Sequence, residues 1–353
     1  MHLTLEEHID LQPHNTFHLP CTARYFLRIH HITQLPPLIH SPLFQSHPHL
    51  ILGSGSNILF ATPEYDSIVL KNEIPGIEPI SSTTPAHTTL KVSSGVLWTS
   101  LVDYCLTHQL GGIENLALIP GTVGAAPVQN VGAYGVEIAS VVDSVEVVDL
   151  RTGETRVVSN QECEFGYRDS IFKRGGRGGE WFITAVRITL TNAGHGYVPN
   201  TMYGSVRETL EQDMGIDIDR VSIQDVAKAV CRLRRRKLPD PQVLGNAGSF
   251  FVNPLLQGQM SEESFVQRHP GVLVFRRGDG RMVVPAGELI EACGWKGWRA
   301  SCTGVYEAHA LILVNYGGAK GKEVLELAGR ISDSVWDWFG IRLRTEITII
   351  LGQ

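Results

Sequence analysis

The run Ile119–Gly135 constrains the fold of this chain more than any other segment. Small residues alternate there with hydroxyl and amide side chains over about seventeen positions. Glycine has no Cβ, so a ligand can approach its main chain closely. The run therefore favours a long, flat cofactor held against the backbone, with a purely structural glycine-rich loop as the alternative. Glycine accounts for 36 of the 353 residues, and its excess is concentrated between Gly111 and Gly135.

A second segment, Leu50–Asn57, is a short apolar strand that leads into a Gly/Ser turn. Small residues in such a turn let successive backbone N–H groups converge on an anion such as a pyrophosphate. The segment lacks the third glycine of the dinucleotide-binding fingerprint and the Gly-Lys-Ser/Thr ending of a P-loop. Neither a Rossmann domain nor a P-loop ATPase is supported, and an ordinary tight turn explains this segment equally well.

The chain is long enough for two or three domains, since a single hydrophobic core rarely serves more than ~250–300 residues. Antiparallel pairing is expected in the middle region, because two strands there are joined by the short turn Arg151–Glu154. The predicted elements are strands at Leu50–Leu52, Ser67–Leu70 and Thr88–Ser93, a helix at Val96–Gln109, a hairpin of Val141–Leu150 with Thr155–Val158, and a strand at Phe182–Leu190.

A polar segment, Thr191–Ser205, follows these strands, and a mobile loop that carries Tyr203 is expected there. The amphipathic helix Ile223–Lys237 comes next, with Ser222 and Asp225 in the pattern of a capping box, and a domain boundary is placed near it. Beyond it we predict a strand at Val272–Phe275, a turn at Gly278–Gly280, a helix at Ala286–Cys293, a strand at Leu311–Asn315, and an amphipathic helix that buries Val324, Leu327, Ala328, Ile331 and Val335 and stops at Gly340.

Composition narrows the functional class. A net charge of −6 and a pI near 6.2 disfavour a nucleic-acid-binding protein. The six cysteines are scattered without Cys-x-x-Cys spacing, which indicates a reducing compartment and no structural zinc. Nine of the fourteen histidines fall in the first fifty residues, but their Pro-rich segments offer no carboxylate or thiolate to complete a metal site. We therefore expect surface histidines and no bound metal.

Location and assembly follow from the same features. No apolar run approaches the ~18 residues that a membrane span needs, and the first residues have neither the basic nor the apolar region of a signal peptide. A cytoplasmic protein without membrane contact is expected. A monomer is also expected, although nothing in the sequence fixes the oligomeric state.

Four blocks of sequence carry a family resemblance: Leu52–Asn57, Ile119–Gly135, Gly166–Ser170, and Gly245–Phe251 followed by Asn253-Pro254. In order and spacing they resemble the UDP-N-acetylenolpyruvoylglucosamine reductase family. With Asn15–Phe17 near the start and Glu346 near the end, the resemblance covers almost the whole chain. One such block could arise by chance, whereas several in register do not.

The resemblance implies an α+β fold: an FAD-binding domain of the p-cresol methylhydroxylase type, made of two α/β subdomains, plus a smaller α+β substrate-binding domain. The implied boundaries are 1–70 with the C-terminal strand 341–353 for the first subdomain, 71–221 for the second, and 222–340 for the substrate domain. The implied reaction is NADPH-dependent reduction of UDP-N-acetyl-3-O-(1-carboxyvinyl)glucosamine to UDP-N-acetylmuramate, a step of peptidoglycan precursor synthesis.

This chemistry requires particular side chains. Hydride delivery to an enol ether leaves negative charge that spreads into the attached carboxylate, so cationic or hydrogen-bonding groups and a proton donor are needed. The resemblance places Arg168 and Glu346 at the carboxylate and makes Ser249 the proton donor. Each has an ordinary alternative: a salt bridge from Arg168 to Asp169, a solvated edge-strand carboxylate for Glu346, and a helix cap or turn role for Ser249.

The two glycine-rich blocks are the predicted FAD site. They contain no histidine or cysteine that would form a covalent flavin link, so FAD is expected to be bound non-covalently. The predicted FAD contacts are Gly53, Ser54, Gly55, Ser56, Asn57, Pro120, Gly121, Thr122, Gly124, Ala125, Gln129, Asn130, Gly132, Ala133, Tyr134 and Gly135. No separate nicotinamide fingerprint is present, which implies that NADPH and the substrate alternate at one site.

The resemblance implies substrate contacts from Tyr203, Lys237 and Asn253, with Tyr203 in the subtype whose tyrosine-bearing loop closes over the UDP-sugar. Lys237 ends a cluster of cations that starts at Arg232, and cations in the last turn of a helix are also explained by the helix dipole. A nucleic-acid patch is the less favoured alternative.

Two departures from the family pattern are visible, Val252 and Thr348, where the family commonly has basic residues. They put secondary charge contacts in doubt and leave the proposed proton donor untouched. Two other functions stay open: a flavin-dependent oxidase of the same fold superfamily, and a non-catalytic UDP-sugar-binding protein or flavin sensor. The blocks around Lys237 and Ser249 argue against the oxidase, and the intact trio of Arg168, Ser249 and Glu346 argues against the sensor.

Overall fold

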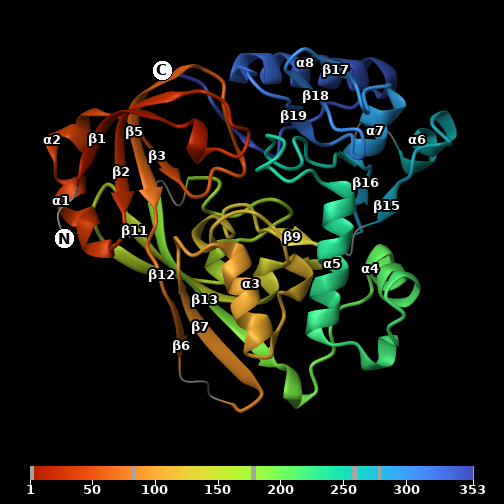
Figure 1. Cartoon of the computed structure of the whole chain (residues 1–353), viewed down its shortest axis with the longest axis horizontal. Helices are drawn as coiled ribbons and strands as arrows, with labels where there is room; N and C mark the ends of the chain where they lie inside the picture. The colour runs from red at the N-terminus through yellow and green to blue at the C-terminus, as the bar shows by residue number, and fades with distance from the viewer. Residues whose placement is uncertain (1–3, 81–83, 176–179, 257–260, 277–279, 353) are drawn as a thin grey trace. The chain divides into compact units, whose positions relative to one another are not determined.

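The computed structural model describes residues 4–80, 84–175, 180–256, 261–276 and 280–352 (Figure 1). The chain forms two compact units, each assembled from separate stretches. Unit one comprises Met1–Ile9, Ala23–Ser54 and Ser67–Arg235, and unit two comprises Asp10–Thr22, Gly55–Asp66 and Arg236–Gln353. The predicted division into three domains at 70, 221 and 340 stays a prediction. The predicted turn at Gly278–Gly280 lies largely outside the described residues.

Unit one is built around an antiparallel sheet with the strand order β12-β11-β13-β7-β6, and β8 also pairs with β13. The strands are β6 (Ile77–Ile80), β7 (His87–Ser93), β8 (Leu110–Gly111), β11 (Val142–Asp149), β12 (Thr155–Ser159) and β13 (Trp181–Asn192). The predicted hairpin of β11 and β12 is confirmed, with Val145 opposite Val158. Valines and isoleucines at alternate positions of these strands supply one apolar face to the core.

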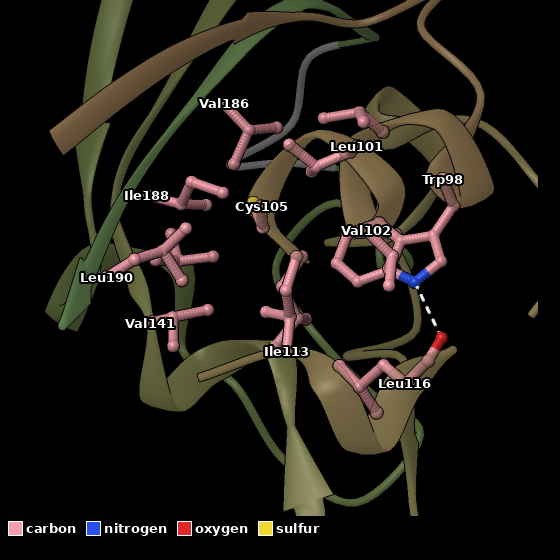
Figure 2. Close-up of a cluster of buried hydrophobic side chains, with 14 of the residues drawn as sticks. Trp98, Leu101, Val102, Cys105, Ile113, Leu116, Val141, Val186, Ile188 and Leu190 are labelled. Atoms are coloured by element: carbon pink, nitrogen blue, oxygen red, sulfur yellow. Dashed lines mark hydrogen bonds between the residues drawn. The ribbon is translucent and has the colours of Figure 1, made fainter. Parts of the chain in front are cut away.

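Helix α3 (Trp98–Thr107) forms within the predicted range Val96–Gln109. It covers this sheet, and Figure 2 shows the resulting core. Its face of Leu101 and Cys105 points toward Val186 and Ile188 of β13, and all four side chains are buried. The indole of Trp98 is also buried and donates a hydrogen bond to the Leu116 carbonyl oxygen at 3.0 Å. The polar atom of this large side chain is therefore satisfied, as burial requires.

A second sheet has the order β1-β2-β5-β3. Its strands are β1 (Leu5–Asp10), β2 (Thr22–Ile29), β3 (His49–Leu52) and β5 (Glu64–Asn72), and the short helices α1 (Leu35–Ile39) and α2 (Pro42–Ser46) lie between β2 and β3 in sequence. Strands β3 and β5 run parallel, with Leu52 opposite Lys71. The predicted Gly/Ser turn begins directly after β3, so the strand pair fixes where that turn starts.

The end of unit one is helical. Helix α5 (Ile223–Lys237) begins as predicted, because the Ser222 and Asp225 side chains each accept a hydrogen bond from the other residue's N–H group. The predicted continuous loop over Thr191–Ser205 is wrong at both ends: β13 extends to Asn192, and helix α4 (Gly204–Glu208) starts directly after Tyr203. A π-helical turn, Thr209–Asp213, follows α4.

Unit two contains helices α6 (Glu262–Arg268), α7 (Ala286–Ala292) and α8 (Gly321–Phe339) and several short strands. The strands are β4 (Ile58–Phe60), β14 (Leu255–Leu256), β15 (Phe275–Arg276), β16 (Met282–Val283), β17 (Arg299–Ala300), β18 (Thr303–Val305), β19 (Leu313–Asn315) and β20 (Thr348–Ile350). They form the sheets β14-β16-β15 and β17-β18-β19 and the parallel pair of β20 with β4.

Helix α8 buries the five apolar residues predicted from its periodicity and ends at Gly340, whose φ of +67° is a glycine-favoured C-cap conformation. The strand predicted at Val272–Phe275 is displaced toward β15, and the one predicted at Leu311–Asn315 is shortened to β19, because both are short edges fixed by pairing rather than by pattern. Among the described residues, no helix is long and apolar enough to cross a membrane.

Candidate active site

The two glycine-rich blocks meet in unit one, at Gly53 and Thr122. A Cβ placed on Gly53 would lie 2.7 Å from the Thr122 Oγ1, so no larger residue fits without displacing that side chain. Gly121 has a φ of +136°, which only glycine adopts readily. A Cβ on Gly124 would lie 2.5 Å from the Ser94 Cβ, so this glycine serves close packing within the protein. The two blocks that were predicted to bind FAD are therefore in contact within unit one.

A hairpin follows, formed by β9 (Gly132–Ala133) and β10 (Val136–Glu137). Its two turn residues, Tyr134 and Gly135, have φ values of +50° and +80°, as a type I′ turn requires. A tyrosine in this conformation is strained, since non-glycine residues rarely adopt positive φ. The turn therefore holds the Tyr134 ring in a direction that an ordinary loop would not select.

Asn130 is 1% exposed and links three segments of unit one. Its amide nitrogen donates to the Glu137 carboxylate at 2.8 Å and to the Gly166 carbonyl at 2.9 Å. Its amide oxygen accepts the Ala139 N–H at 3.1 Å. The side chain is thus engaged within the protein, which favours a positioning role at this predicted FAD contact.

Arg168 lies next to the same hairpin. Its guanidinium donates to the Gly132 carbonyl at 2.9 Å, and its own φ is +54°. The tight turn around it is closed by the Gly166 N–H, which donates to the Asp169 carbonyl at 2.9 Å. The Asp169 carboxylate contacts Arg174 at 2.7 Å. Asp169 therefore forms its ion pair with Arg174, and the guanidinium of Arg168 is directed to the hairpin.

Tyr203 packs against Tyr134 within unit one. The ring centroids are 5.5 Å apart and the rings are nearly perpendicular, at 83°. Burial raises the pKa of the Tyr134 phenol, and the positive charge of Arg234 acts in the opposite direction. The Arg234 Nε also donates to the Leu118 carbonyl at 3.2 Å. The tyrosine predicted to contact substrate is 49% exposed and stands at the start of α4.

The segment before Tyr203 is anchored by side chains that the sequence analysis did not single out. Asn115 is buried and donates to the Tyr134 carbonyl at 3.1 Å and to the Asn200 carbonyl at 2.9 Å. The Tyr197 phenol donates to the buried Glu114 carboxylate at 2.6 Å. Isolated polar residues of this kind leave no motif in a sequence, so only their partners identify them.

Unit two holds Ser249 and Glu346 on neighbouring extended segments. Ser249 forms a bridge with Ile312, and Phe251 forms one with Thr345. The Glu346 N–H donates to the Phe250 carbonyl at 2.8 Å. Ser249 is therefore not a helix cap, and both side chains are half-buried. The positive φ of Gly248, +71°, turns the chain immediately before this serine.

The segment around Glu346 is not a sheet edge. On its other side the Asn57 amide donates to the Glu346 carbonyl at 3.4 Å, and the Thr348 N–H donates to the Asn57 carbonyl at 3.0 Å. Gly55 completes this part of unit two. Its φ is +68°, and a Cβ there would lie 2.1 Å from the His14 carbonyl oxygen. A glycine is required at this position by close contact with the N-terminal segment.

The remaining predicted substrate contacts also lie in unit two. Lys237 is exposed at the end of α5, and its charge lowers the pKa of His309, although burial is the larger cause. The Asn253 side-chain oxygen accepts the Ala286 N–H at 3.0 Å, which caps α7. Val252 is 8% exposed, so this departure from the family pattern places an apolar side chain at a buried position.

The structure thus assembles two groups of predicted residues, each within one unit. Arg168, Tyr134 and Tyr203 share unit one, and Ser249 and Glu346 share unit two. Of the other predicted FAD contacts, Ser54, Gln129 and Ala133 are half-buried in unit one, Pro120 and Ala125 are exposed there, and Ser56 is half-buried in unit two.

Comparison with known proteins adds independent information. A family model described as an FAD binding domain matches residues 23–159. A second, described as the C-terminal domain of UDP-N-acetylenolpyruvoylglucosamine reductase, matches residues 240–350. The chain is 43% identical over 336 residues to the UDP-N-acetylenolpyruvoylglucosamine reductase of Burkholderia multivorans, covering 95% of this chain and 94% of the relative. It is 40% identical over 346 residues to that of Pseudomonas syringae, covering 98% and 99%.

A solved structure is similar over the same extent. The crystal structure of UDP-N-acetylenolpyruvylglucosamine reductase from Thermus caldophilus matches with a TM-score of 0.66 at 22% identity. The match covers 99% of this chain and 100% of that chain. At this identity the likeness concerns the fold alone.

Proposed function

Because this chain belongs to the UDP-N-acetylenolpyruvoylglucosamine reductase family, we propose that it reduces the enolpyruvyl ether of UDP-N-acetylglucosamine to UDP-N-acetylmuramate with NADPH as the hydride source. The predicted family and α+β fold class are confirmed: an FAD-binding domain is followed by the family's C-terminal domain, and the chain is an FAD-dependent oxidoreductase of peptidoglycan precursor synthesis. The single observation that carries the proposal is the relationship to curated reductases over nearly the full length of both chains.

The residues of both glycine-rich blocks fit an FAD. Gly53 lies against Thr122 where a Cβ would fill the space, and Tyr134 and Gly135 hold a positive-φ turn. Such main-chain surfaces suit a diphosphate and a flat ring system. A bound FAD would supply the hydride transfer from NADPH to the substrate. The sixteen predicted contacts remain the proposed site, with Asn130 as a positioning residue because its amide is engaged by Glu137, Gly166 and Ala139.

The catalytic assignment rests on charge. Arg168 would neutralise the substrate carboxylate as negative charge spreads into it, since a guanidinium binds a carboxylate through paired donors. Its guanidinium is held in place by the Gly132 carbonyl. Glu346 would form a hydrogen bond with this substrate carboxylate, either as a protonated acid or through a water molecule. Ser249 would donate the proton to the carbanion-like carbon, with its hydroxyl polarised by the surrounding site.

Substrate binding is assigned to three side chains. Lys237 would pair with the diphosphate of the UDP-sugar, Asn253 would add a hydrogen bond, and Tyr203 would close over the substrate from its place against Tyr134. NADPH and the substrate would use this site in turn. Nucleotide sugars and NADPH are cytoplasmic metabolites, so we propose that the protein is located in the cytoplasm, where its substrates are. A monomer remains the expected oligomeric state.

An anaerobic two-step experiment tests this function. NADPH added to the oxidised protein should bleach the flavin colour, and the enolpyruvyl substrate added next should restore it. Restoration by oxygen but not by substrate would point to a flavin oxidase. Absence of any bleaching by NADPH or NADH would point to a binding protein. UDP-N-acetylglucosamine, which lacks the enolpyruvyl group, is the control and should not restore the colour.

A further inference from the structure

Lys71 lies directly beside the first glycine-rich turn, although no motif includes it. It belongs to β5 and is paired with Leu52, the last residue of the parallel strand β3. Its ammonium donates a hydrogen bond to the carbonyl oxygen of Gly53, the first residue of the turn. Lys71 and the Gly53–Ser54 peptide are both in unit one.

This hydrogen bond sets the direction of one peptide group. In a trans peptide the C=O and the following N–H point in opposite directions across the peptide plane. Because Lys71 holds the Gly53 carbonyl, the Ser54 N–H is directed away from Lys71. The Gly53 Cα is confined from a further direction by the Thr122 side chain, at 2.7 Å from the position of a Cβ. The Gly53 side of this peptide is therefore held by two contacts.

The ammonium of Lys71 is partly buried, which disfavours its charged form. Burial lowers the pKa of its ammonium, and Arg28 lowers it further, while Glu73 acts in the opposite direction. Glu73 is itself in contact with Arg28 at 3.1 Å. Within the described parts of the chain, no carboxylate forms an ion pair with the ammonium of Lys71. A partly desolvated cation without a carboxylate partner, lying behind a glycine turn, provides positive potential for an anion at that turn.

We propose that Lys71 is a positioning residue for an anionic diphosphate: it fixes the Gly53–Ser54 peptide so that the Ser54 N–H faces the ligand, and it adds positive charge behind that peptide. The inference rests on the proposed function, in which the ligand is FAD. The ordinary alternative is a lysine that only satisfies a carbonyl group and stabilises the turn. A positioning role predicts that loss of Lys71 weakens ligand binding beyond any loss of protein stability, whereas a purely structural role does not.

The test compares FAD binding by the apoprotein and its variants. Lys71→Met removes donor and charge, and Lys71→Gln retains a donor without charge. Lys91→Met is the matched control, because Lys91 is a lysine of the same unit. Lys91 lies on strand β7, and its ammonium contacts the Glu146 carboxylate at 2.8 Å. The dissociation constant of FAD is measured by flavin fluorescence quenching, and the melting temperature of each apoprotein is recorded. For the FAD-saturated proteins, the two phosphorus resonances of the bound diphosphate are recorded by NMR.

Lys71→Met should weaken FAD binding by roughly 10- to 100-fold, the range for a lost hydrogen bond to a charged group, and should shift at least one phosphorus resonance. Lys71→Gln should fall between Lys71→Met and the unmodified protein. Lys91→Met should leave the FAD dissociation constant and the phosphorus resonances unchanged. A Lys71→Met dissociation constant within twofold of the unmodified protein would overturn the inference, as would an equal loss in Lys91→Met. If the unmodified apoprotein does not bind FAD, the proposed function itself is overturned, so the two failures are distinguishable.

Discussion

The Arg234 guanidinium and the Tyr134 phenol interact electrostatically in a half-buried part of unit one. Burial lowers the pKa of Arg234 and raises that of Tyr134, and the contact between them acts against burial in both cases. Tyr203 packs edge-on against the same ring at 5.5 Å. A cation in the last turn of α5 therefore lies against the tyrosine that Tyr203 packs on.

Replacing Arg234 by methionine should destabilise unit one. The variant loses the hydrogen bond to the Leu118 carbonyl and the electrostatic interaction with Tyr134, and the expected loss is ~1.5–3 kcal/mol in the free energy of unfolding. Urea denaturation measures this quantity. Arg232→Met is the matched control, because Arg232 is exposed and donates to the Asp213 carbonyl at 3.2 Å. An equal loss in both variants would mean that the helix tolerates neither change and that the Tyr134 contact has no special weight.

Tyr203→Phe should weaken binding of the enolpyruvyl substrate while reduction of the flavin by NADPH stays nearly intact. The phenylalanine ring can keep the edge-on contact with Tyr134, so the change isolates the hydroxyl group. Loss of one hydrogen bond to a charged group costs ~1.5–3 kcal/mol of binding free energy. Isothermal titration with the substrate measures it, and an unchanged affinity would remove Tyr203 from the substrate site.

The acid stability of unit one should depend on Glu146. Burial acts to raise the pKa of its carboxyl, but hydrogen bonds from Lys91 and Arg187 outweigh burial and lower it below the ordinary 4.5. A carboxyl whose folded pKa is lowered stabilises the fold above its unfolded pKa, and that stability is lost as pH falls through the folded pKa. Stability from Glu146 should therefore be complete at neutral pH and decline below about pH 4.5.

Glu146→Gln should flatten this decline. Melting temperatures recorded from neutral pH to pH 2.5 should differ most from the unmodified protein at neutral pH and converge in acid. Glu154→Gln, at an exposed position in the turn between β11 and β12, is the control and should follow the unmodified curve. Parallel curves for Glu146→Gln and the unmodified protein would show that the carboxylate gives no pH-dependent stability.

The purified protein should be yellow, with FAD released by acid. The two glycine-rich blocks contain no histidine or cysteine for a covalent link. Precipitation with acid should therefore leave the flavin absorbance in the supernatant. Colour that remains with the denatured pellet would contradict non-covalent binding.

Local pattern predicted much of the fold. The periodicity of α8 and the capping residues of α5 are local signals, and both elements are found where they were expected. The division into units is not local. Gly55 packs so closely against the His14 carbonyl, more than forty positions earlier in the sequence, that a Cβ would not fit. Unit two therefore gathers stretches that no local sequence pattern joins.

The candidate site divides in the same way. Gly53 and Thr122 belong to recognisable blocks and are found in contact. Lys71 and Asn115 belong to no recognisable motif, and only their hydrogen bonds to Gly53 and to the Tyr134 carbonyl reveal them. Helix α4 was missed because Tyr203 at its start provides no side-chain cap, so the sequence there carries no start signal.

The two half-reactions separate the proposed role of Ser249 from flavin binding. Ser249→Ala should leave flavin reduction by NADPH unchanged, because that step takes no proton from this position. Reoxidation of the reduced flavin by the enolpyruvyl substrate should slow by at least ~10²- to 10⁴-fold, the contribution of a general acid. Ser249→Cys should recover part of the rate, since a thiol can still donate a proton.

Stopped-flow absorbance of the flavin, recorded anaerobically for each half-reaction of Ser249→Ala, is the most direct measurement. The reductive step should be unchanged and the oxidative step should be slowed. Reoxidation by the enolpyruvyl substrate at the rate of the unmodified protein would contradict the assignment of Ser249 as the proton donor.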